Sequence, residues 1–375
     1  MFIDWLSISQ EYDHDLPQVC DVFSVVIDAH TGAEISRRHP RFKHEGSFST
    51  VLTVHVSGRK VTVEGNPSRY GRPDNLIGFK TIQQCVSVYN AVLAEYGLPP
   101  FTKCTKVWLR DGESGARSSH WVADGARLHR VDVTTNFAVG KNNVDAYLRA
   151  LSSQRIGRNP GYLYPNGKTV VWNPSGGEKS GRLMYRKAYD KAAEMQLNLL
   201  PSVKRKFGEN SAEYKYVQRV HQVCVEQGIV RFEQEFKKEF LDRKAMCFWG
   251  LFDESSFEEL HSEFLGVDKK LEVTAMDLVS IADVLISEGV VKSKQAANAT
   301  ALVWTTWMDG RAIGLSNRQF ETHAARLNRI GIDIRRAPDV TTSSPVIVKQ
   351  VREITKTSIV IPAFYSMPNH LRVAA

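Results

Sequence analysis

The sequence predicts an α+β protein, with an antiparallel-sheet, palm-like α/β core followed by a mainly helical C-terminal domain. Three observations support this fold class. Segments with alternating apolar residues are separated by segments with helical spacing. A strand pattern that carries an aspartate occurs twice, at 2–8 and 128–137, which suggests two duplicated halves. After residue 268 the spacing becomes helical, so we expect units at 1–127, 128–268 and 269–375.

The N-terminal half begins with a strand from Phe2 to Ser9, which would place Phe2, Asp4, Leu6 and Ile8 on one face. An interior carboxylate such as Asp4 needs a partner. Residues 12–45 are polar and irregular, with a weak strand signal at 22–27. Alternation at 48–56 and again at 61–64 predicts a hairpin.

The next segments are a loop, a helix and a longer loop. Turn-forming residues fill 65–73, and apolar residues at helical spacing follow from Ile82 to Tyr96. Gly97 stands where a helix C-cap is expected. The polar stretch 99–127 is predicted to be a connecting loop.

The second half alternates strands with helices. We expect strands at 128–137, 168–173, 183–189 and 229–236, and helices at 142–151 and 214–225. Asp190 is placed to cap a further helix. In the C-terminal part, Thr274, Ser293 and Ser316 are predicted helix N-caps. Two of these helices permit a helix-turn-helix interpretation, although a plain helical domain is the simpler interpretation.

Composition favours a polyanionic partner. The 375 residues carry a net charge of +8, with a pI near 9.1, and nucleic acid is the leading candidate. A basic protein without a nucleic-acid role remains the alternative. The five cysteines show no CxxC motif and are expected to be reduced thiols. The N-terminus does not resemble a signal peptide, and no apolar run reaches the ~20 residues of a membrane span.

The segment 182–194 holds the strongest candidate nucleophiles, Tyr185 and Tyr189, with Lys191 close by. On a strand the two tyrosines share a face about 13 Å apart. A tyrosine can attack a phosphodiester when a cation or metal activates it. Seven Lys or Arg residues lie between 182 and 206, which is consistent with DNA binding but also with a solvated face. Most tyrosines only pack, so the segment alone decides nothing.

A metal-dependent nuclease would need oxygen ligands for Mg²⁺ or Mn²⁺. The strand carboxylates Asp132, Glu233 and Glu64 are the candidates, with Asp4 as a fourth. Each could equally be an ion-pair partner. The sequence has no His-hydrophobe-His pair, no Walker A motif, no GxGxxG and no GxSxG.

Five ordered segments resemble the replication initiators of filamentous bacteriophages, the gene II/gene X family. They are FIDWL, VEGNPSRYGRPDNLIG, LHRVDVTTNF, TVVWN leading into LMYRKAYDKAAE, and GIVRFEQEFK. The segment 314–332 fits a second block of the family. The resemblance spans nearly the whole chain.

The resemblance implies a rolling-circle initiator that nicks the plus strand at the phage origin through a 5′-phosphotyrosyl intermediate and later rejoins the displaced strand. The family's A-Y-x-K segment falls on 188–191, which favours Tyr189 over Tyr185 and gives Lys191 a catalytic role. Whether Tyr185 assists Tyr189 stays open. Magnesium or manganese would be held by Asp132 and Glu233, with Glu64 as a third ligand.

The implied partners are single- and double-stranded origin DNA and the host helicase and polymerase, in the cytoplasm of the bacterial host. A non-catalytic origin-binding protein or repressor is the alternative function. A structural or membrane-assembly phage protein is disfavoured by the lack of an apolar span. The candidate DNA contacts are Arg69, Arg72, Arg130, Arg182, Arg186, Lys187 and Arg231.

Overall fold

The computed structural model describes residues 1–20, 22–38, 40–45, 51–111, 119–173, 181–268, 274–276, 281–308, 313–330, 332–335 and 351–369. The chain divides into two compact units, one of residues 1–271 with 355–375 and one of residues 272–354. The boundaries expected at 127 and 268 stay predictions.

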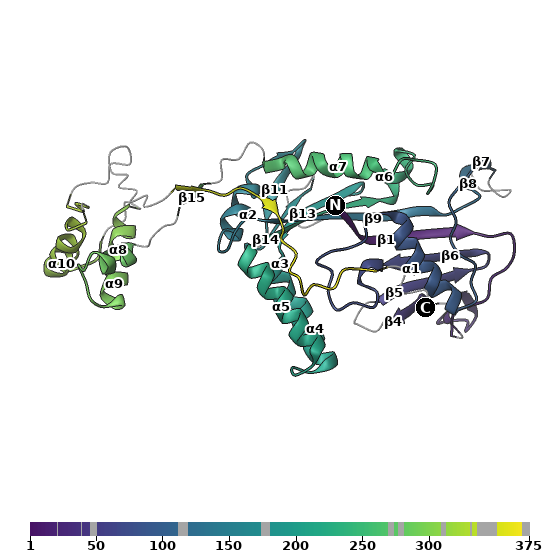
Figure 1. The fold of residues 1–375 in the computed structure, drawn as a ribbon, viewed down its shortest axis with the longest axis horizontal. Helices are drawn as coiled ribbons and strands as arrows, with labels where there is room; N and C mark the ends of the chain where they lie inside the picture. The colour runs from purple at the N-terminus through teal and green to yellow at the C-terminus, as the bar shows by residue number, and fades with distance from the viewer. Residues whose placement is uncertain are drawn as a thin grey trace. The chain divides into compact units, whose positions relative to one another are not determined.

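One antiparallel sheet organises the larger unit (Figure 1), which confirms the α+β class. Every strand pairing in it is antiparallel. In spatial order the strands are β10 (Arg155–Ile156), β11 (Asn159–Leu163), β12 (Thr169–Trp172), β13 (Met184–Asp190), β14 (Ile229–Lys237), β9 (Arg127–Ala138), β1 (Phe2–Glu11), β6 (Lys60–Gly65), β5 (Val51–Ser57) and β4 (Phe42–Glu45), with β17 (Thr357–Ser358) also paired to β9.

Strand order is the same on both sides of the central β1–β9 pair. Moving outward from β1, the sheet continues with β6, β5 and β4, and moving outward from β9 it continues with β14, β13 and β12. In each half the first strand therefore pairs with the last. This arrangement is what a duplicated unit would give, and the duplication itself stays a prediction.

Helices cover the two faces of the sheet differently. The apolar face packs against α1 (Ile82–Glu95), α6 (Lys238–Arg243) and α7 (Ser255–Leu265), and its core joins Leu6 and Val131 of the sheet to Val86 of α1 and Phe257 of α7. Ile229 belongs to a separate cluster with Met195 and Val220, on the helices that follow β13. In Figure 1 these helices extend away from α6 and α7.

The remaining helical elements of this unit are η1 (Pro67–Arg69), α2 (Val144–Ser152), α3 (Lys191–Glu194), a π-helical turn η2 (Met195–Leu199), α4 (Leu200–Phe207), α5 (Ala212–Gln227) and η3 (Gly266–Asp268).

Helix termini follow the sequence signals. Thr81 and Gln84 form a capping box at the start of α1, and Gly97 adopts a positive φ just after its end. Asp190 caps α3 by accepting a hydrogen bond from the backbone N–H of Ala193. Gly228 ends α5 at φ +60°, and a Cβ there would lie 2.1 Å from the Gly140 carbonyl oxygen, so only glycine fits.

The first strand departs from simple alternation, and this corrects the expected common face of Phe2, Asp4, Leu6 and Ile8. Its register against β9 shifts between Ile3 and Trp5. The bulge turns Asp4 away from the buried Leu6 and Ile8. The expected partners of Asp4 are present, because Asn66 and Asn75 each donate an amide hydrogen bond to its Oδ1 at 2.9 and 3.1 Å.

The expectation of a simple loop over 99–127 was wrong. This stretch contains a hairpin of β7 (Val107–Arg110) and β8 (His120–Ala123). Each strand has four residues, too few for alternation to be distinguished from chance in a polar sequence. The stretch expected to be irregular at 12–45 also holds β2 (Ser24–Ile27), β3 (Glu34–Arg38) and β4.

The smaller unit contains α8 (Ile281–Ser287), α9 (Lys294–Met308), α10 (Asn317–Asn328) and the paired strands β15 (Thr274–Met276) and β16 (Val351–Glu353). The prediction that Thr274 caps a helix was wrong, because Thr274 pairs with Glu353 in a strand. Ser316 caps α10 with a capping box, and Ser293 accepts a backbone hydrogen bond at the start of α9. The helix-turn-helix interpretation stays a prediction.

All five cysteines are free thiols, as the sequence predicted. Across the described ranges, we find no helix with the length and apolar character needed to span a bilayer.

Candidate active site

Alternate residues on three neighbouring strands point to the polar face of the sheet. Directly paired residues of antiparallel strands share a face. The pairs that define this face are Tyr189 with Arg231, Lys187 with Glu233, Tyr185 with Glu235, and Glu235 with Asp132. The sequence-predicted nucleophiles and two of the predicted carboxylates therefore lie on the same side.

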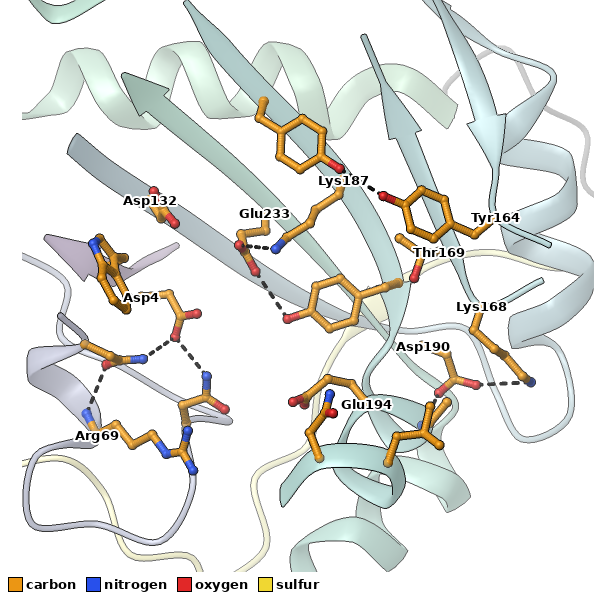
Figure 2. A pocket seen from close by; sticks show the side chains of 18 of the residues that line it. Asp4, Arg69, Asp132, Tyr164, Lys168, Thr169, Lys187, Asp190, Glu194 and Glu233 are labelled. Carbon is orange, nitrogen blue, oxygen red and sulfur yellow. Dashed lines mark hydrogen bonds and ion pairs between the residues drawn. The ribbon is translucent and has the colours of Figure 1, made fainter. Parts of the chain in front are cut away.

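A pocket of about 640 Å³ opens on this face. Figure 2 shows its labelled side chains arriving from several strands, from the loop after β6 and from α3. The lining residues are Asp4, Trp5, Asn66, Arg69, Asn75, Arg130, Asp132, Tyr164, Asn166, Lys168, Thr169, Tyr185, Lys187, Tyr189, Asp190, Ala193, Glu194, Leu197, Asn198 and Glu233.

The Tyr189 hydroxyl donates a hydrogen bond to Glu233 Oε2 at 3.2 Å. Burial raises the pKa of Tyr189 well above its ordinary value, and the negative charge of Glu233 raises it further. The phenol is therefore protonated at neutral pH, and it can attack only if its proton passes to an acceptor. Glu233 already occupies the acceptor position.

Lys187 is the lysine beside this tyrosine. Its Nζ lies 2.6 Å from Glu233 Oε1 and 5.6 Å from the centre of the Tyr189 ring. Figure 2 shows Lys187 and Glu233 facing each other. Burial opposes the charge of Lys187, but the Glu233 carboxylate overcomes it and raises the pKa of Lys187. The ammonium group thus stays charged next to the phenol.

Tyr185 lines the same pocket but has different neighbours. Its hydroxyl lies 3.3 Å from that of Tyr164, and no carboxylate accepts a hydrogen bond from it among the described residues. Burial raises its pKa, with a smaller contribution from Tyr164. Of the two tyrosines, Tyr189 is the one with a proton acceptor in contact.

Asp132 lies on β9, buried beside Arg130. The guanidinium donates two hydrogen bonds to the carboxylate, from Nε at 2.8 Å and from Nη2 at 2.6 Å. Burial raises the pKa of Asp132 to about 7; Arg130 lowers it, and the nearby Glu233 and Glu235 raise it. The carboxylates of Asp132, Glu233 and Glu235 therefore lie close enough for their negative charges to interact.

The carboxylates of Asp132 and Glu233 in this pocket are the type of ligand that binds a divalent cation. Mg²⁺ in proteins is commonly held by one or two carboxylates, with water or substrate phosphate completing its shell. Asp132 and Glu233 both face the pocket, and after burial the charge of Glu233 is among the causes that raise the pKa of Asp132. At present Arg130 and Lys187 satisfy them, and no cluster of three or more ligand side chains suited to a metal occurs within the described residues.

Glu64 lies apart from this pair. It is on β6, where it ion-pairs with Arg41 and accepts a hydrogen bond from the Ser7 hydroxyl at 3.4 Å. It does not line the pocket.

Lys191 sits behind the pocket wall. Its side chain is 1% exposed, and its Nζ donates to Glu194 Oε2 at 2.6 Å and to Asn75 Oδ1 at 2.9 Å. Burial lowers the pKa of Lys191, and the positive charge of Arg231 lowers it further. These contacts tie α3 to the loop after β6. A catalytic role for Lys191 stays a prediction, and the geometry favours Lys187.

Three of the predicted DNA-binding residues, Arg69, Arg130 and Lys187, line the pocket. Burial lowers the pKa of Arg69. Arg231 is fully buried beneath the site, where its Nε donates to Asn136 Oδ1 at 2.9 Å and its Nη1 lies 3.9 Å from Asp4 Oδ2. Arg231 therefore supports the polar face from below.

The other three predicted DNA-binding arginines lie elsewhere. Arg72 is buried, and its guanidinium donates to the Tyr365 hydroxyl at 2.8 Å and to the Ser366 carbonyl at 2.7 Å. These contacts give Arg72 a structural position, and its contact with DNA stays a prediction. Arg186 is paired with Gln234 of β14 in the sheet, so its side chain lies on the apolar face. Arg182 is exposed and forms an ion pair with Glu239.

Several pocket residues were missed by the sequence analysis, among them Asn66, Asn75, Glu194 and Lys168. Asn66 lies within the predicted loop at 65–73 and Asn75 just after it, and their shared partner is Asp4. An aspartate on an otherwise apolar strand was the one signal available for finding them.

Known proteins resemble this chain over most of its length. The family model for the N-terminal part of the phage replication-associated protein, the gene II protein, matches residues 1–255, and the model for its C-terminal part matches residues 285–371. The chain is similar to the replication-associated protein of this kind from Escherichia phage If1, with 45% identity over 324 residues, which are 86% of this chain and 100% of the relative. No solved structure matches.

Proposed function

The chain belongs to the phage replication-associated protein family, that of the gene II protein, and from this membership and the pocket geometry we propose that it is a rolling-circle replication initiator. It nicks the plus strand at the phage origin, stays joined to the 5′-phosphate through Tyr189, and later rejoins the displaced strand. The contact of the Tyr189 hydroxyl with Glu233, next to Lys187, carries this proposal.

In the proposed nicking step the Tyr189 oxygen attacks the phosphorus of the scissile linkage. The bond from phosphorus to the 3′-oxygen breaks, and that oxygen takes a proton from water to become the 3′-hydroxyl of a primer. The phenolic proton passes to Glu233, which already accepts its hydrogen bond. The phosphotyrosyl ester retains the energy of the broken linkage, so rejoining is the reverse attack by a 3′-hydroxyl and needs no ATP.

Cationic side chains stabilise the charge that develops in this step. Lys187 lies beside the phenol, where a fixed positive charge stabilises the phenolate and the phosphate oxygens. Arg69 and Arg130, which also line the pocket, hold neighbouring phosphates. Because these contacts are ionic, binding should weaken steeply with salt.

We further propose that Asp132 and Glu233 hold Mg²⁺ or Mn²⁺ when DNA binds. The metal would act as a Lewis acid on the scissile phosphate. Arg130 and Lys187, which now pair with these carboxylates, would then be available to the phosphate. The remaining partners in the proposal are origin DNA, both single- and double-stranded, and the host helicase and polymerase, in the cytoplasm of the bacterial host.

A nicking assay tests this function. Supercoiled replicative-form DNA is incubated with the protein and Mg²⁺, and the relaxed circular product is measured. Tyr189→Phe should abolish relaxation, whereas Tyr185→Phe, the matched change on the same strand face, should retain it. If the Tyr189→Phe protein relaxes DNA as fast as the parent, the nucleophile is wrong. If the parent binds origin DNA without relaxing it, the protein is a non-catalytic origin-binding protein.

A further inference from the structure

A second cavity lies outside the Tyr189 pocket, between the β7–β8 hairpin and the segment after α6. Its volume is about 560 Å³, within the range of ligand-binding pockets. It is lined mainly by apolar and aromatic side chains, namely Val107, His120, Trp121, Arg127, Asp242, Ala245, Cys247, Phe248 and Leu251. We call it the hairpin groove. Figure 1 shows the hairpin beyond the end of β9 that is remote from β17.

The groove is held in shape by the backbone. Leu128 N–H donates to the Cys247 carbonyl at 2.7 Å, and Trp249 N–H donates to the Ala126 carbonyl at 3.1 Å. These bonds fix the 247–249 segment against the start of β9. Phe248 is thus presented from a rigid support, as a binding platform requires, whereas Trp121 comes from β8 of the hairpin.

The groove exposes large apolar surface that the fold does not cover. Trp121 is 55% exposed, and Leu109 opposite it and Leu251 are exposed as well. Phe248 is stacked beneath a cation, with Arg127 Cζ 5.3 Å from its ring centre. Aromatic faces next to an arginine are the arrangement on which unpaired bases stack.

The surroundings of the groove are positively charged. Lys60 lines a smaller adjoining pocket that shares Trp121, Arg127 and Phe248 with the groove. Burial lowers the pKa of Lys60, and the positive charges of Lys238 and Arg127 lower it further. Burial also lowers the pKa of His129 to about 4, and the same three cations contribute to this shift. Asp242 pairs with Arg127 and Glu11 pairs with Arg110, so Lys60 and Lys238 carry the positive charge that these pairs do not offset.

This charge decides between two kinds of occupant. An apolar segment of a partner protein would fit the hydrophobic walls but would gain nothing from three neighbouring cations. A nucleic-acid strand uses both features, because its phosphates meet the cations and its bases meet the aromatic rings. Double-stranded DNA does not offer free base faces, so the chemistry points to a single strand.

We propose that the hairpin groove is a second single-strand binding site, in which unpaired bases stack on Trp121 and Phe248 while Lys60, Arg127 and Lys238 contact the backbone. This second binding site depends on the proposed function only for the identification of the bound polyanion as DNA. Arg127 and Asp132 are five residues apart on β9, so the groove begins about 17 Å from the pocket carboxylates. A strand melted at the nick can reach both sites.

The test measures binding without cleavage, in the Tyr189→Phe background. Fluorescently labelled dT20 is titrated by anisotropy at fixed salt, with a blunt hairpin duplex as comparison. Trp121→Ala should weaken dT20 binding by roughly 5- to 150-fold, the effect of losing one stacked base, and should change duplex binding by less than about 2-fold. Lys60→Glu should also weaken dT20 binding and reduce its salt dependence.

Trp108→Ala is the matched control. Trp108 lies on the same hairpin, is 40% exposed and does not line the groove. This variant should bind dT20 within about 2-fold of its parent. Both tryptophans are on the surface, so both variants should fold, which circular dichroism checks.

Three results would overturn the proposal. The first is unchanged dT20 affinity in Trp121→Ala, and the second is an equal loss in Trp108→Ala. The third is retained dT20 binding together with lost binding of an apolar dye in Trp121→Ala, which would assign the groove to an apolar protein segment. Failure of the nicking function is distinguishable, because dT20 binding does not require Tyr189.

Discussion

Glu233 joins Tyr189 to Lys187. One of its carboxylate oxygens accepts the hydrogen bond from the Tyr189 hydroxyl at 3.2 Å, and the other lies 2.6 Å from the Lys187 ammonium. Glu233 is directly paired with Lys187, and Tyr189 lies two residues further along β13 on the same face, so the regular register of two strands builds the contact. The predictions below follow from this arrangement and from the contacts around it.

Removing the charge of Lys187 should slow nicking strongly. Lys187→Gln takes away the cation beside the phenol, and the expected loss in single-turnover nicking is about 10²- to 10³-fold. Lys187→Arg should recover part of the rate. Lys168→Gln is the control, because Lys168 lines the same pocket but pairs with Asp145 and Asp190. Equal rates for Lys187→Gln and the parent would remove Lys187 from the mechanism.

Lys191→Met should affect stability more than chemistry. The change leaves Glu194 and Asn75 without their shared donor, at a cost of about 1–3 kcal/mol in the free energy of unfolding, which urea titration measures. The nicking rate of the folded fraction should fall less than in Lys187→Gln. A folded, fully stable variant that does not nick would show instead that Lys191 is the catalytic lysine.

Asp132 should make the metal-free protein less stable as the pH rises. Its folded pKa is raised to about 7 from 3.8, so the native state binds more protons than the unfolded state between these values. The contribution of this group to stability is therefore lost as the pH rises from about 4 to about 7. Asp132→Asn lacks the effect. In urea titrations with EDTA, the stability of the parent relative to Asp132→Asn should be lower at about pH 7.5 than at about pH 5, and an opposite trend would contradict the pKa shift.

The C-terminal segment should stabilise the loop that carries Arg69. The Tyr365 hydroxyl donates to Asp74 Oδ1 at 2.8 Å and accepts from Arg72 at 2.8 Å. Tyr365→Phe leaves these buried groups unsatisfied and should cost about 1–3 kcal/mol by urea titration. Met367→Ala, at an exposed neighbouring position, should be nearly neutral. Equal stability of the two variants would show that the hydroxyl contacts do not hold the loop.

Strong periodic segments made much of the fold predictable. Alternation identified β9, β13 and β14, and helical spacing with capping residues identified α1 and α5. The strands of the β7–β8 hairpin are too short for an alternation of apolar and polar residues to predict them. The bulge at Asp4 interrupts the alternation on which the prediction of the β1 faces depended. A bulge is set by pairing with a distant strand, which local sequence does not encode.

The site was only partly predictable. Side-chain alternation placed Tyr189, Glu233 and Asp132 on one face once the strands were paired, but the strand order itself came from the structure. Sequence proximity favoured Lys191 as the neighbour of Tyr189. The helix that begins at Lys191 turns that side chain away, whereas Lys187 stays on the strand face.

Mapping the covalent DNA adduct tests the central claim most directly. The protein is incubated with Mg²⁺ and a labelled single-stranded origin oligonucleotide, digested with trypsin and nuclease, and analysed by mass spectrometry. Trypsin separates the two tyrosines, because cleavage at Arg182, Arg186, Lys187 and Lys191 leaves Tyr185 in LMYR and Tyr189 in AYDK. We predict a nucleotide on AYDK. A nucleotide on LMYR, or efficient nicking with no adduct on either peptide, would contradict the assignment of Tyr189.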